Sequence, residues 1–157
     1  MDFGMTLIGV IVVAICTVPL VGMYIKKKNK EHKMLDVLKD LATKQDCNIT
    51  EHEFCRNFAI AIDQSKHFLF FDKHSEQAED ALFINLEEIK SSKVVKTMRE
   101  GSKVSVIQKV ELVLTPSTNA ADIKLELYND NSNMQINEEL QMAEKWSEII
   151  NNQLKNR

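Results

Sequence analysis

The sequence predicts an α+β protein with an N-terminal transmembrane helix, a bent antiparallel sheet or barrel, and a C-terminal amphipathic helix that caps it. Three observations predict this fold. Residues 3–25 carry no charge, residues 57–128 show apolar alternation with a period of two, and residues 138–155 repeat apolar positions at helical spacing. Consecutive strands followed by one amphipathic helix are typical of an α+β domain, because the helix must bury its apolar face against the sheet.

The apolar segment 3–25 (FGMTLIGVIVVAICTVPLVGMYI) is the predicted transmembrane helix. At about 1.5 Å per residue it spans roughly 35 Å, enough to cross a hydrocarbon core of about 30 Å. A cleaved signal peptide needs a basic start and a small-residue cleavage site, and neither is present. Ile15 before Cys16 argues against lipoprotein processing. A buried helix of a soluble domain is seldom apolar on every face. We therefore expect an uncleaved anchor.

Five lysines follow the apolar segment directly, and no Lys or Arg precedes it. Because basic residues are retained on the cytoplasmic side, we expect the N-terminus outside and the rest of the chain in the cytoplasm. The same lysines are candidate contacts for the anionic inner leaflet of the lipid bilayer. They are Lys26, Lys27, Lys28, Lys30 and Lys33.

The chain divides into four predicted regions. These are the short N-terminus with the transmembrane helix (1–25), a basic juxtamembrane segment (26–33), a linker or stalk helix (34–48) and a globular domain (49–157). Met34, Leu38 and Leu41 share one stripe of the stalk helix at helical spacing. If this helix continues from the anchor, it forms a stiff stalk whose apolar face packs on the domain.

Charge is distributed unevenly along the chain. The whole chain has 20 basic and 23 acidic residues and a net charge of −3. Residues 1–33 hold five lysines against Asp2 and Glu31, which leaves 15 basic and 21 acidic residues, or −6, in the remainder. An acidic domain behind a basic segment argues against a nucleic acid as the partner, because nucleic-acid binding needs a basic domain.

The alternating region predicts consecutive strands joined by polar turns. Residues 49–58 are ambiguous, because Thr50 and Glu53 spell a capping box for a short helix but also suit an edge strand. Phe58, Ile60 and Ile62 begin the clear alternation, and residues 64–66 make the first predicted hairpin turn. Further strands are expected at 67–72, 81–86, 89–98, 104–114 and from Ile123 to Leu127.

The last predicted element is a helix over 138–155, with Asn137 as its N-cap. Its apolar face carries Trp146, the only tryptophan of the chain. The other members of this face are Leu140, Ala143, Ile150 and Leu154. Because nothing else can bury Trp146, the helix must cover an open end or face of the sheet.

The strands between Asn57 and Tyr128 and the helix ELQMAEKWSEIINNQL, with Trp146 at its middle, resemble a pleckstrin-homology-like (PH-like) domain. The whole chain is similar to uncharacterised single-pass bacterial membrane proteins that attach such a domain to an N-terminal anchor. Phosphoinositide-binding members of this fold carry a basic cluster in the first hairpin loop, whereas Asp63, Gln64, Ser65 and one lysine, Lys66, occupy it here. The resemblance therefore implies a scaffold and not headgroup binding by that loop.

Two sets of side chains are candidates for chemistry or binding. Cys47, His52 and Cys55 are close in sequence but have irregular spacing and no obvious fourth zinc ligand, so we expect free thiols in a reducing compartment and no cofactor. A basic hairpin offers a ridge for an anionic partner or the lipid surface, or else a solvated strand edge that blocks unwanted pairing. Its members are Lys90, Lys93, Lys96, Arg99 and Lys103, with Lys109 nearby.

The sequence favours a membrane-tethered, non-enzymatic interaction module, such as a scaffold or adaptor, with an unknown protein partner. The alternative is a thiol- or metal-dependent sensor or enzyme that uses Cys47, His52 and Cys55. The chain contains no GxGxxG, GxxxxGK[ST] or HExxH motif.

Topology is the first testable expectation. A reporter fused after Arg157 should behave as cytoplasmic, because five lysines lie on that side of the apolar segment. An alkaline phosphatase fusion should be inactive at the same position. Activity of that periplasm-only reporter would contradict both the orientation and the reduced state of the thiols.

Overall fold

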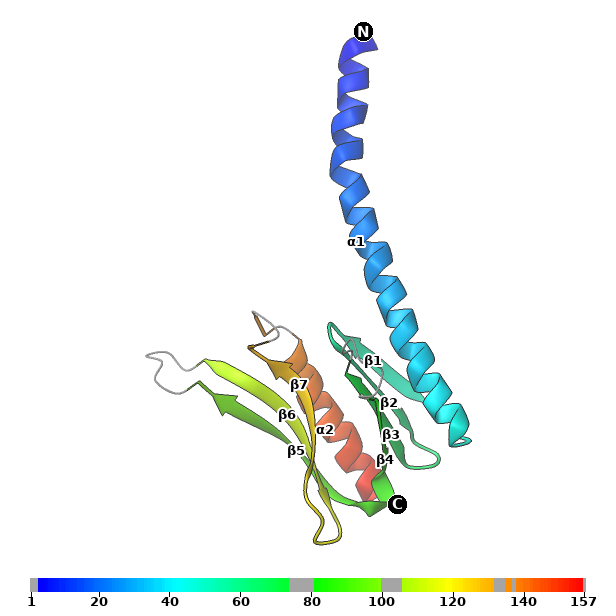
Figure 1. The fold of residues 1–157 in the computed structure, drawn as a ribbon, viewed down its shortest axis with the longest axis vertical. Coiled ribbons are helices and arrows are strands. Elements are labelled where there is room, and N and C mark those ends of the chain that lie inside the picture. The colour runs from blue at the N-terminus through cyan, green and yellow to red at the C-terminus, as the bar shows by residue number, and fades with distance from the viewer. Residues whose placement is uncertain (1–2, 74–80, 100–105, 132–134, 137, 157) are drawn as a thin grey trace.

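The computed structural model describes residues 3–73, 81–99, 106–131, 135–136 and 138–156. It confirms the α+β class, with a long helix α1 (Phe3–Lys44), two antiparallel sheets and a C-terminal helix α2 (Glu139–Lys155) (Figure 1). The strands are β1 (Glu51–Cys55), β2 (Phe58–Asp63), β3 (Phe68–Lys73), β4 (Ala81–Asn85), β5 (Ile89–Met98), β6 (Ile107–Pro116) and β7 (Ile123–Asn129).

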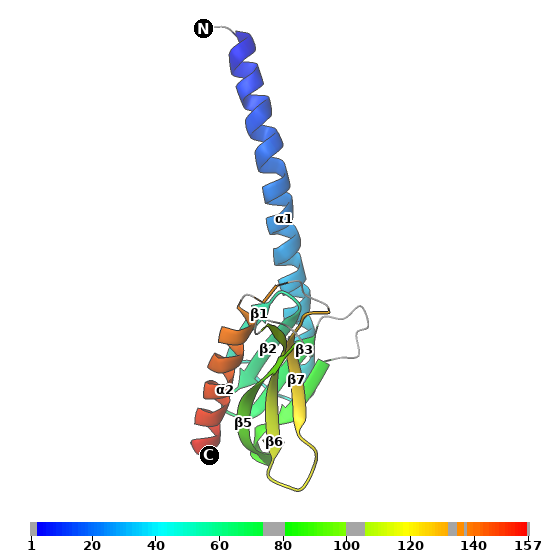
Figure 2. The same cartoon turned by 90° about the vertical axis from the view of Figure 1, so that its left-hand side faces the viewer.

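Helix α1 joins the predicted anchor, basic segment and stalk into one element. It runs through Pro19 and through the lysines without interruption. Its N-terminal half stands clear of the domain in both views (Figures 1 and 2), and the apolar side chains from Ile8 to Ile25 are exposed. In the described part of the chain, this is the one helix long and apolar enough to cross a membrane.

A Schellman motif ends α1, and residues 45–50 separate the helix from β1. Asp46 adopts a left-handed conformation with φ of 55°, and the Cys47 amide donates to the Ala42 carbonyl at 2.8 Å. The Asp46 amide donates to the Thr43 carbonyl at 3.0 Å. These bonds satisfy carbonyls that the helix end leaves without partners and turn the chain back toward the end of the domain nearest the apolar half of α1.

The strands form two separate sheets, and no closed barrel is found among the described residues. Sheet A has the order β1-β2-β3-β4 and sheet B the order β5-β6-β7, with all neighbours antiparallel. Between them, Leu86–Glu88 form a short 3₁₀ turn capped by the Asn85 side chain. This turn directs the chain from β4 into β5, the first strand of the second sheet.

Both faces of strand β2 in sheet A are buried. Phe58, Ile60 and Ile62 of β2 face the core between the sheets, whereas Ala59 and Ala61 face α1. The small alanine side chains let the helix approach the strand closely, and α1 buries an apolar stripe there. The side chains buried on this outer face are Met34, Leu38, Ala42, Cys47, Ala59, Ala61 and Phe70. The predicted packing of the stalk on the domain is therefore confirmed.

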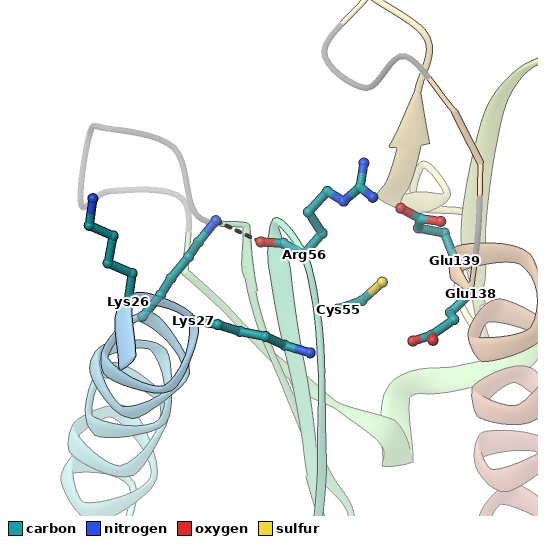
Figure 3. A pocket seen from close by; sticks show the side chains of 7 residues that line it. Lys26, Lys27, Cys55, Arg56, Glu138 and Glu139 are labelled. Carbon is teal, nitrogen blue, oxygen red and sulfur yellow. Dashed lines mark hydrogen bonds between the residues drawn. The ribbon is translucent and has the colours of Figure 1, made fainter. Parts of the chain in front are cut away.

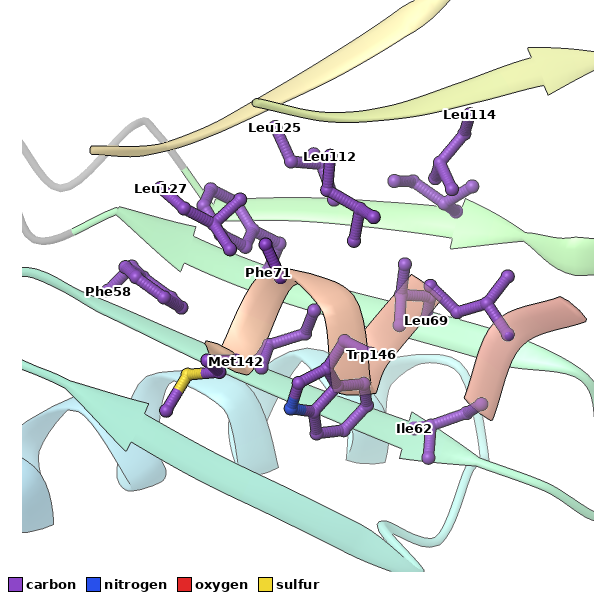
Figure 4. Packing of buried hydrophobic residues seen from close by; sticks show 14 of the residues in the cluster. Phe58, Ile62, Leu69, Phe71, Leu112, Leu114, Leu125, Leu127, Met142 and Trp146 are labelled. Atoms are coloured by element: carbon purple, nitrogen blue, oxygen red, sulfur yellow. The ribbon is translucent and has the colours of Figure 1, made fainter. Parts of the chain in front are cut away.

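The main core lies between the two sheets and α2 (Figure 4). Trp146 is fully buried among apolar side chains of both sheets, and its indole Nε1 donates to Glu53 Oε2 at 2.9 Å. This bond provides the partner that a buried indole N–H needs. The largest fully buried members of the core include Phe58, Ile60, Ile62, Leu69, Leu86, Leu112, Leu114, Leu125 and Ile150.

Helix α2 also closes the outer edge of β5. The Asn151 side-chain oxygen accepts from the Ser92 amide at 2.9 Å, and its nitrogen donates to the Ser92 carbonyl at 2.8 Å. The side-chain amide thus replaces a neighbouring strand at this point of the edge. Such a closure blocks pairing by another chain there.

Several expected boundaries differ from the structure. The ambiguous segment 49–58 contains strand β1 and not a helix, so the first hairpin turn is Arg56–Asn57. Residues 64–67 form the second turn, and the next strand begins at Phe68 and not at His67. The expected strand 104–114 is observed only from Ile107, and residues 100–105 lie outside the described residues. Helix α2 has Glu138 at its N-cap without a side-chain bond, and the expected cap Asn137 lies outside the described residues.

Asp63 fixes the turn at the end of sheet A that lies beside the C-terminal end of α1. Its carboxylate accepts from the amides of Asn48 at 2.7 Å, Ser65 at 2.9 Å and Lys66 at 3.1 Å, and from the Ser65 hydroxyl at 2.6 Å. Burial alone raises the pKa of Asp63, but the hydrogen bonds from Ser65, Asn48 and Lys66 outweigh it and hold the pKa below its usual value.

Trp146→Ala in the full chain in detergent should lower the free energy of unfolding by about 3–5 kcal/mol, because it empties the centre of the core. Trp146→Phe should cost less, since a ring remains and only the bond to Glu53 is lost. The exposed Gln141→Ala on the same helix is the matched control. Native Trp146 fluorescence should be blue-shifted and should move red in denaturant; a solvent-like native emission would contradict the buried position.

Asp63→Asn should destabilise the full chain at pH 7 by about 1–3 kcal/mol, because an amide cannot accept all these bonds. A depressed folded pKa contributes stability above the unfolded pKa of about 3.9, and this contribution is lost as pH falls through the folded pKa. The difference between parent and variant should therefore shrink in denaturant melts below about pH 4. Asp36→Asn, on the exposed face of α1, should change little at any pH. A pH-independent difference for Asp63→Asn would contradict this account.

Candidate functional site

A charged cleft of about 680 Å³ lies at the end of the domain nearest the apolar half of α1 (Figure 3). Three segments far apart in the sequence form it. Helix α1 supplies Lys26, Lys27 and Lys30, the β1–β2 turn supplies Cys55 and Arg56, and the start of α2 supplies Glu138 and Glu139. Its volume is within the range of small-molecule sites, roughly 300–1,000 Å³.

The lysine side of the cleft is fixed to the domain by Lys30. Its ammonium donates to the Arg56 carbonyl at 2.6 Å and to Asn57 Oδ1 at 3.3 Å. These bonds hold α1 beside the β1–β2 turn, about one helical turn before Met34, where the apolar packing on sheet A begins. Because α1 is continuous, they also fix the direction in which its neighbouring lysines project.

The lysines of the cleft differ in direction. Figure 3 shows Lys27 extending from α1 toward the side that carries Cys55 and Glu138, whereas Lys26 points away. Lys27 also lies 3.9 Å from Glu31, one helical turn later, in an exposed pair that contributes little. Lys27 is therefore the lysine best placed to meet a ligand in the cleft.

The opposite side of the cleft is acidic. Glu139 is buried and Glu138 is exposed. Figure 3 shows the guanidinium of Arg56 extending toward the carboxylate of Glu139. Basic and acidic groups thus occupy opposite walls, with the Cys55 thiol between them.

The Cys55 thiol is neutral at physiological pH. Burial raises its pKa to about 11, and the negative charges of Glu139 and Glu138 contribute. Because the thiolate is the reactive and metal-binding form, a thiol with this pKa is a weak nucleophile and a weak metal ligand. Its environment is that of a buried structural cysteine at the floor of the cleft.

The structure does not bring together the residues of the predicted thiol site. Cys47 packs beside the end of α1, Cys55 lines the cleft, and the extended strand β1 lies between them. The ring of His52 packs edge-on against Phe54 with centroids 5.3 Å apart. Among the described residues, no group of three or more His, Cys, Asp and Glu side chains is placed to hold a metal ion.

The side chains of the predicted juxtamembrane lysines do not all face the same space. Lys26, Lys27 and Lys30 line the cleft, whereas Lys28 lines a smaller hollow of about 240 Å³ between α1 and β1. Lys33 is exposed. Lys28 therefore provides a natural comparison with Lys27, since the two are adjacent in sequence but face different spaces.

The predicted basic ridge is also divided. Lys96 pairs with Glu144 of α2 at 3.0 Å, and Arg99 forms an ion pair with Asp130. Lys93 is opposite Val113 in the register and Lys96 opposite Val110, so these two lysines lie on different faces of sheet B. Lys90 and Lys93 are exposed, while Lys103 lies outside the described residues.

Lys109 belongs to a cluster that links the two sheets. It lies 2.7 Å from Glu111 and 3.0 Å from Glu126, and Glu126 also pairs with Lys73 of sheet A. Burial raises the pKa of Glu126, but the hydrogen bonds from Lys73, Lys109 and Asn129 outweigh it and lower the pKa overall. These charges stabilise the domain and are not directed at a ligand.

No family model matches this chain, and neither a curated protein nor a solved structure matches it. Function is therefore inferred from the chain's own residues. Sequence reasoning found the lysines of the cleft but missed Arg56, Glu138 and Glu139. The available signal was weak, because Arg56 is a single basic residue in a turn and the two glutamates also read as the acidic start of a helix.

Proposed function

We propose that this chain is a single-pass, membrane-tethered interaction module without catalytic activity, in which α1 holds a PH-like domain on the cytoplasmic face of the bilayer. The observation that carries this proposal is the continuity of α1 from its exposed apolar half to its packing on sheet A. A helix packed in this way holds the domain at a fixed distance from the membrane and in a fixed orientation. A flexible linker would do neither.

The PH-like assignment is supported by the order of the elements. Four antiparallel strands, then three, then one C-terminal helix enclose a single core, with Trp146 of the helix at its centre. The cytoplasmic orientation is supported by the five lysines that follow the apolar segment. The neutral Cys55 thiol and its separation from Cys47 favour an interaction module over the thiol- or metal-dependent alternative.

The outer edge of β4 is where we expect a protein partner. Asn151 closes part of the β5 edge, and Glu53 of β1 is held by Lys145 and Trp146 of α2. No strand pairs with the outer edge of β4 among the described residues. Leu82 and Phe83 on β4 are 41% and 37% exposed. An open edge with exposed apolar side chains suits a partner that adds an extended segment to the sheet.

A photo-crosslinking amino acid at Phe83, in the full chain in native membranes, tests this function. We expect one discrete protein adduct, because the edge of β4 presents both backbone groups and apolar contacts. The same photo-crosslinking amino acid at Lys93 tests whether a partner binds the basic hairpin. Placed at Asp36, on the exposed face of α1, it provides the control. Equal labelling from Phe83 and Asp36, or stoichiometric zinc in the purified full chain, would contradict the proposal.

A further inference from the structure

The charged cleft lies at the depth of the lipid headgroups if α1 spans the bilayer. The apolar segment ends at Ile25, and Lys27 and Lys30 follow by about 3 Å and about 7.5 Å along the helix axis. The headgroup layer on each side of the hydrocarbon core is roughly 5–8 Å thick. A tilt of α1 shortens these two distances along the bilayer normal, so both lysines stay within the headgroup layer. The cleft is thus in contact with phospholipid headgroups and not with bulk water alone.

The walls of the cleft carry opposite charges. Lys27 projects from the α1 side, and Glu138 lies at the start of α2 across the cleft (Figure 3). Arg56, on the β1–β2 turn, extends toward Glu139, so Lys27 and Glu138 are the charged groups left facing each other across the cleft. A ligand with a negative group at one end and a positive hydrogen-bond donor at the other matches this arrangement.

We propose that this cleft binds the phosphoethanolamine headgroup of a phospholipid, with the phosphate beside Lys27 and the ammonium beside Glu138. The phosphate receives a charge-assisted hydrogen bond from the Lys27 ammonium, and the primary ammonium of the headgroup donates to the Glu138 carboxylate. The binding site depends on α1 spanning the bilayer and does not depend on which side of the membrane the domain faces.

Two other headgroups fit less well. A phosphocholine group carries a quaternary ammonium that donates no hydrogen bond and is usually held by aromatic rings. The described residues that line the cleft include no aromatic side chain. A phosphoglycerol group offers only neutral hydroxyls to Glu138, so it can hydrogen-bond to the carboxylate but forms no ion pair with it.

The site is distinct from the turn 63–66, which lacks the basic cluster of the phosphoinositide-binding loops. That turn lies at the membrane-distal end of sheet A, beside the end of α1, where Lys66 pairs with Asp46 at 2.9 Å. The cleft lies at the opposite end of β2, next to Phe58. The two ends of one strand therefore face different environments.

Native mass spectrometry of the full chain, released from mixed micelles with one added phospholipid, tests the proposal. The three arms contain phosphatidylethanolamine, phosphatidylglycerol and phosphatidylcholine with identical acyl chains. We expect one phosphatidylethanolamine to be retained per chain, with weaker retention of phosphatidylglycerol and least of phosphatidylcholine. Equal retention of all three lipids would overturn the proposal and would show that only the acyl chains bind.

Matched variants separate the cleft from a diffuse basic surface. Lys27→Gln should lower phosphatidylethanolamine retention about tenfold, whereas Lys28→Gln removes the same charge one residue away and should change it little. Glu138→Gln should remove the preference for phosphatidylethanolamine over phosphatidylglycerol. Trp146 fluorescence confirms that each variant is folded. Equal losses for Lys27→Gln and Lys28→Gln would overturn the proposal, because the lysines would then act only as a charged surface.

Failure of this inference is distinguishable from failure of the proposed function. A chain that shows no lipid preference but yields a discrete adduct from Phe83 remains a tethered interaction module. A chain that retains phosphatidylethanolamine through Lys27 but yields no adduct has a headgroup site without the proposed protein partner.

Discussion

The packing of α1 on the outer face of sheet A is the contact on which the rest of the structure depends. Met34, Leu38 and Ala42 bury one stripe of the helix against Ala59 and Ala61. Because the same helix continues into the exposed apolar segment, this contact determines how the domain is held relative to that segment (Figures 1 and 2). It also brings the lysines of α1 beside the β1–β2 turn and so creates the cleft.

The kinds of helices and strands and their order were predictable, because each kind of element gives its own pattern of apolar residues along the chain. The alternating strands and the helical repeat around Trp146 each have a period that belongs to one kind of element, and the uncharged segment is recognised by its length. Strand pairing was not predictable, because alternation shows which residues share a face and not which strands are neighbours. Ala59 and Ala61 could equally have faced solvent, and only the apolar stripe of α1 explains why both faces of β2 are buried.

The candidate site was predictable only in part, for a similar reason. Sequence proximity suggested a site at Cys47, His52 and Cys55, but an extended strand advances about 3.3 Å per residue, so β1 carries Cys55 far from the end of α1. The cleft instead unites residues separated by more than a hundred positions, such as Lys27 and Glu138. No local pattern in the sequence predicts that residues so far apart in the chain lie close together in the fold.

Amide hydrogen exchange of the full chain in lipid nanodiscs tests the central claim, that α1 is one rigid helix from the bilayer to the domain. The decisive amides are those of residues 26–33, which belong to water-accessible turns of the helix between the apolar segment and the packed stripe. A continuous helix predicts that they exchange slowly, with protection similar to that of residues 34–42. Exchange of residues 26–33 at the rate of an unstructured peptide would contradict the account, because the domain would then hang from a flexible linker.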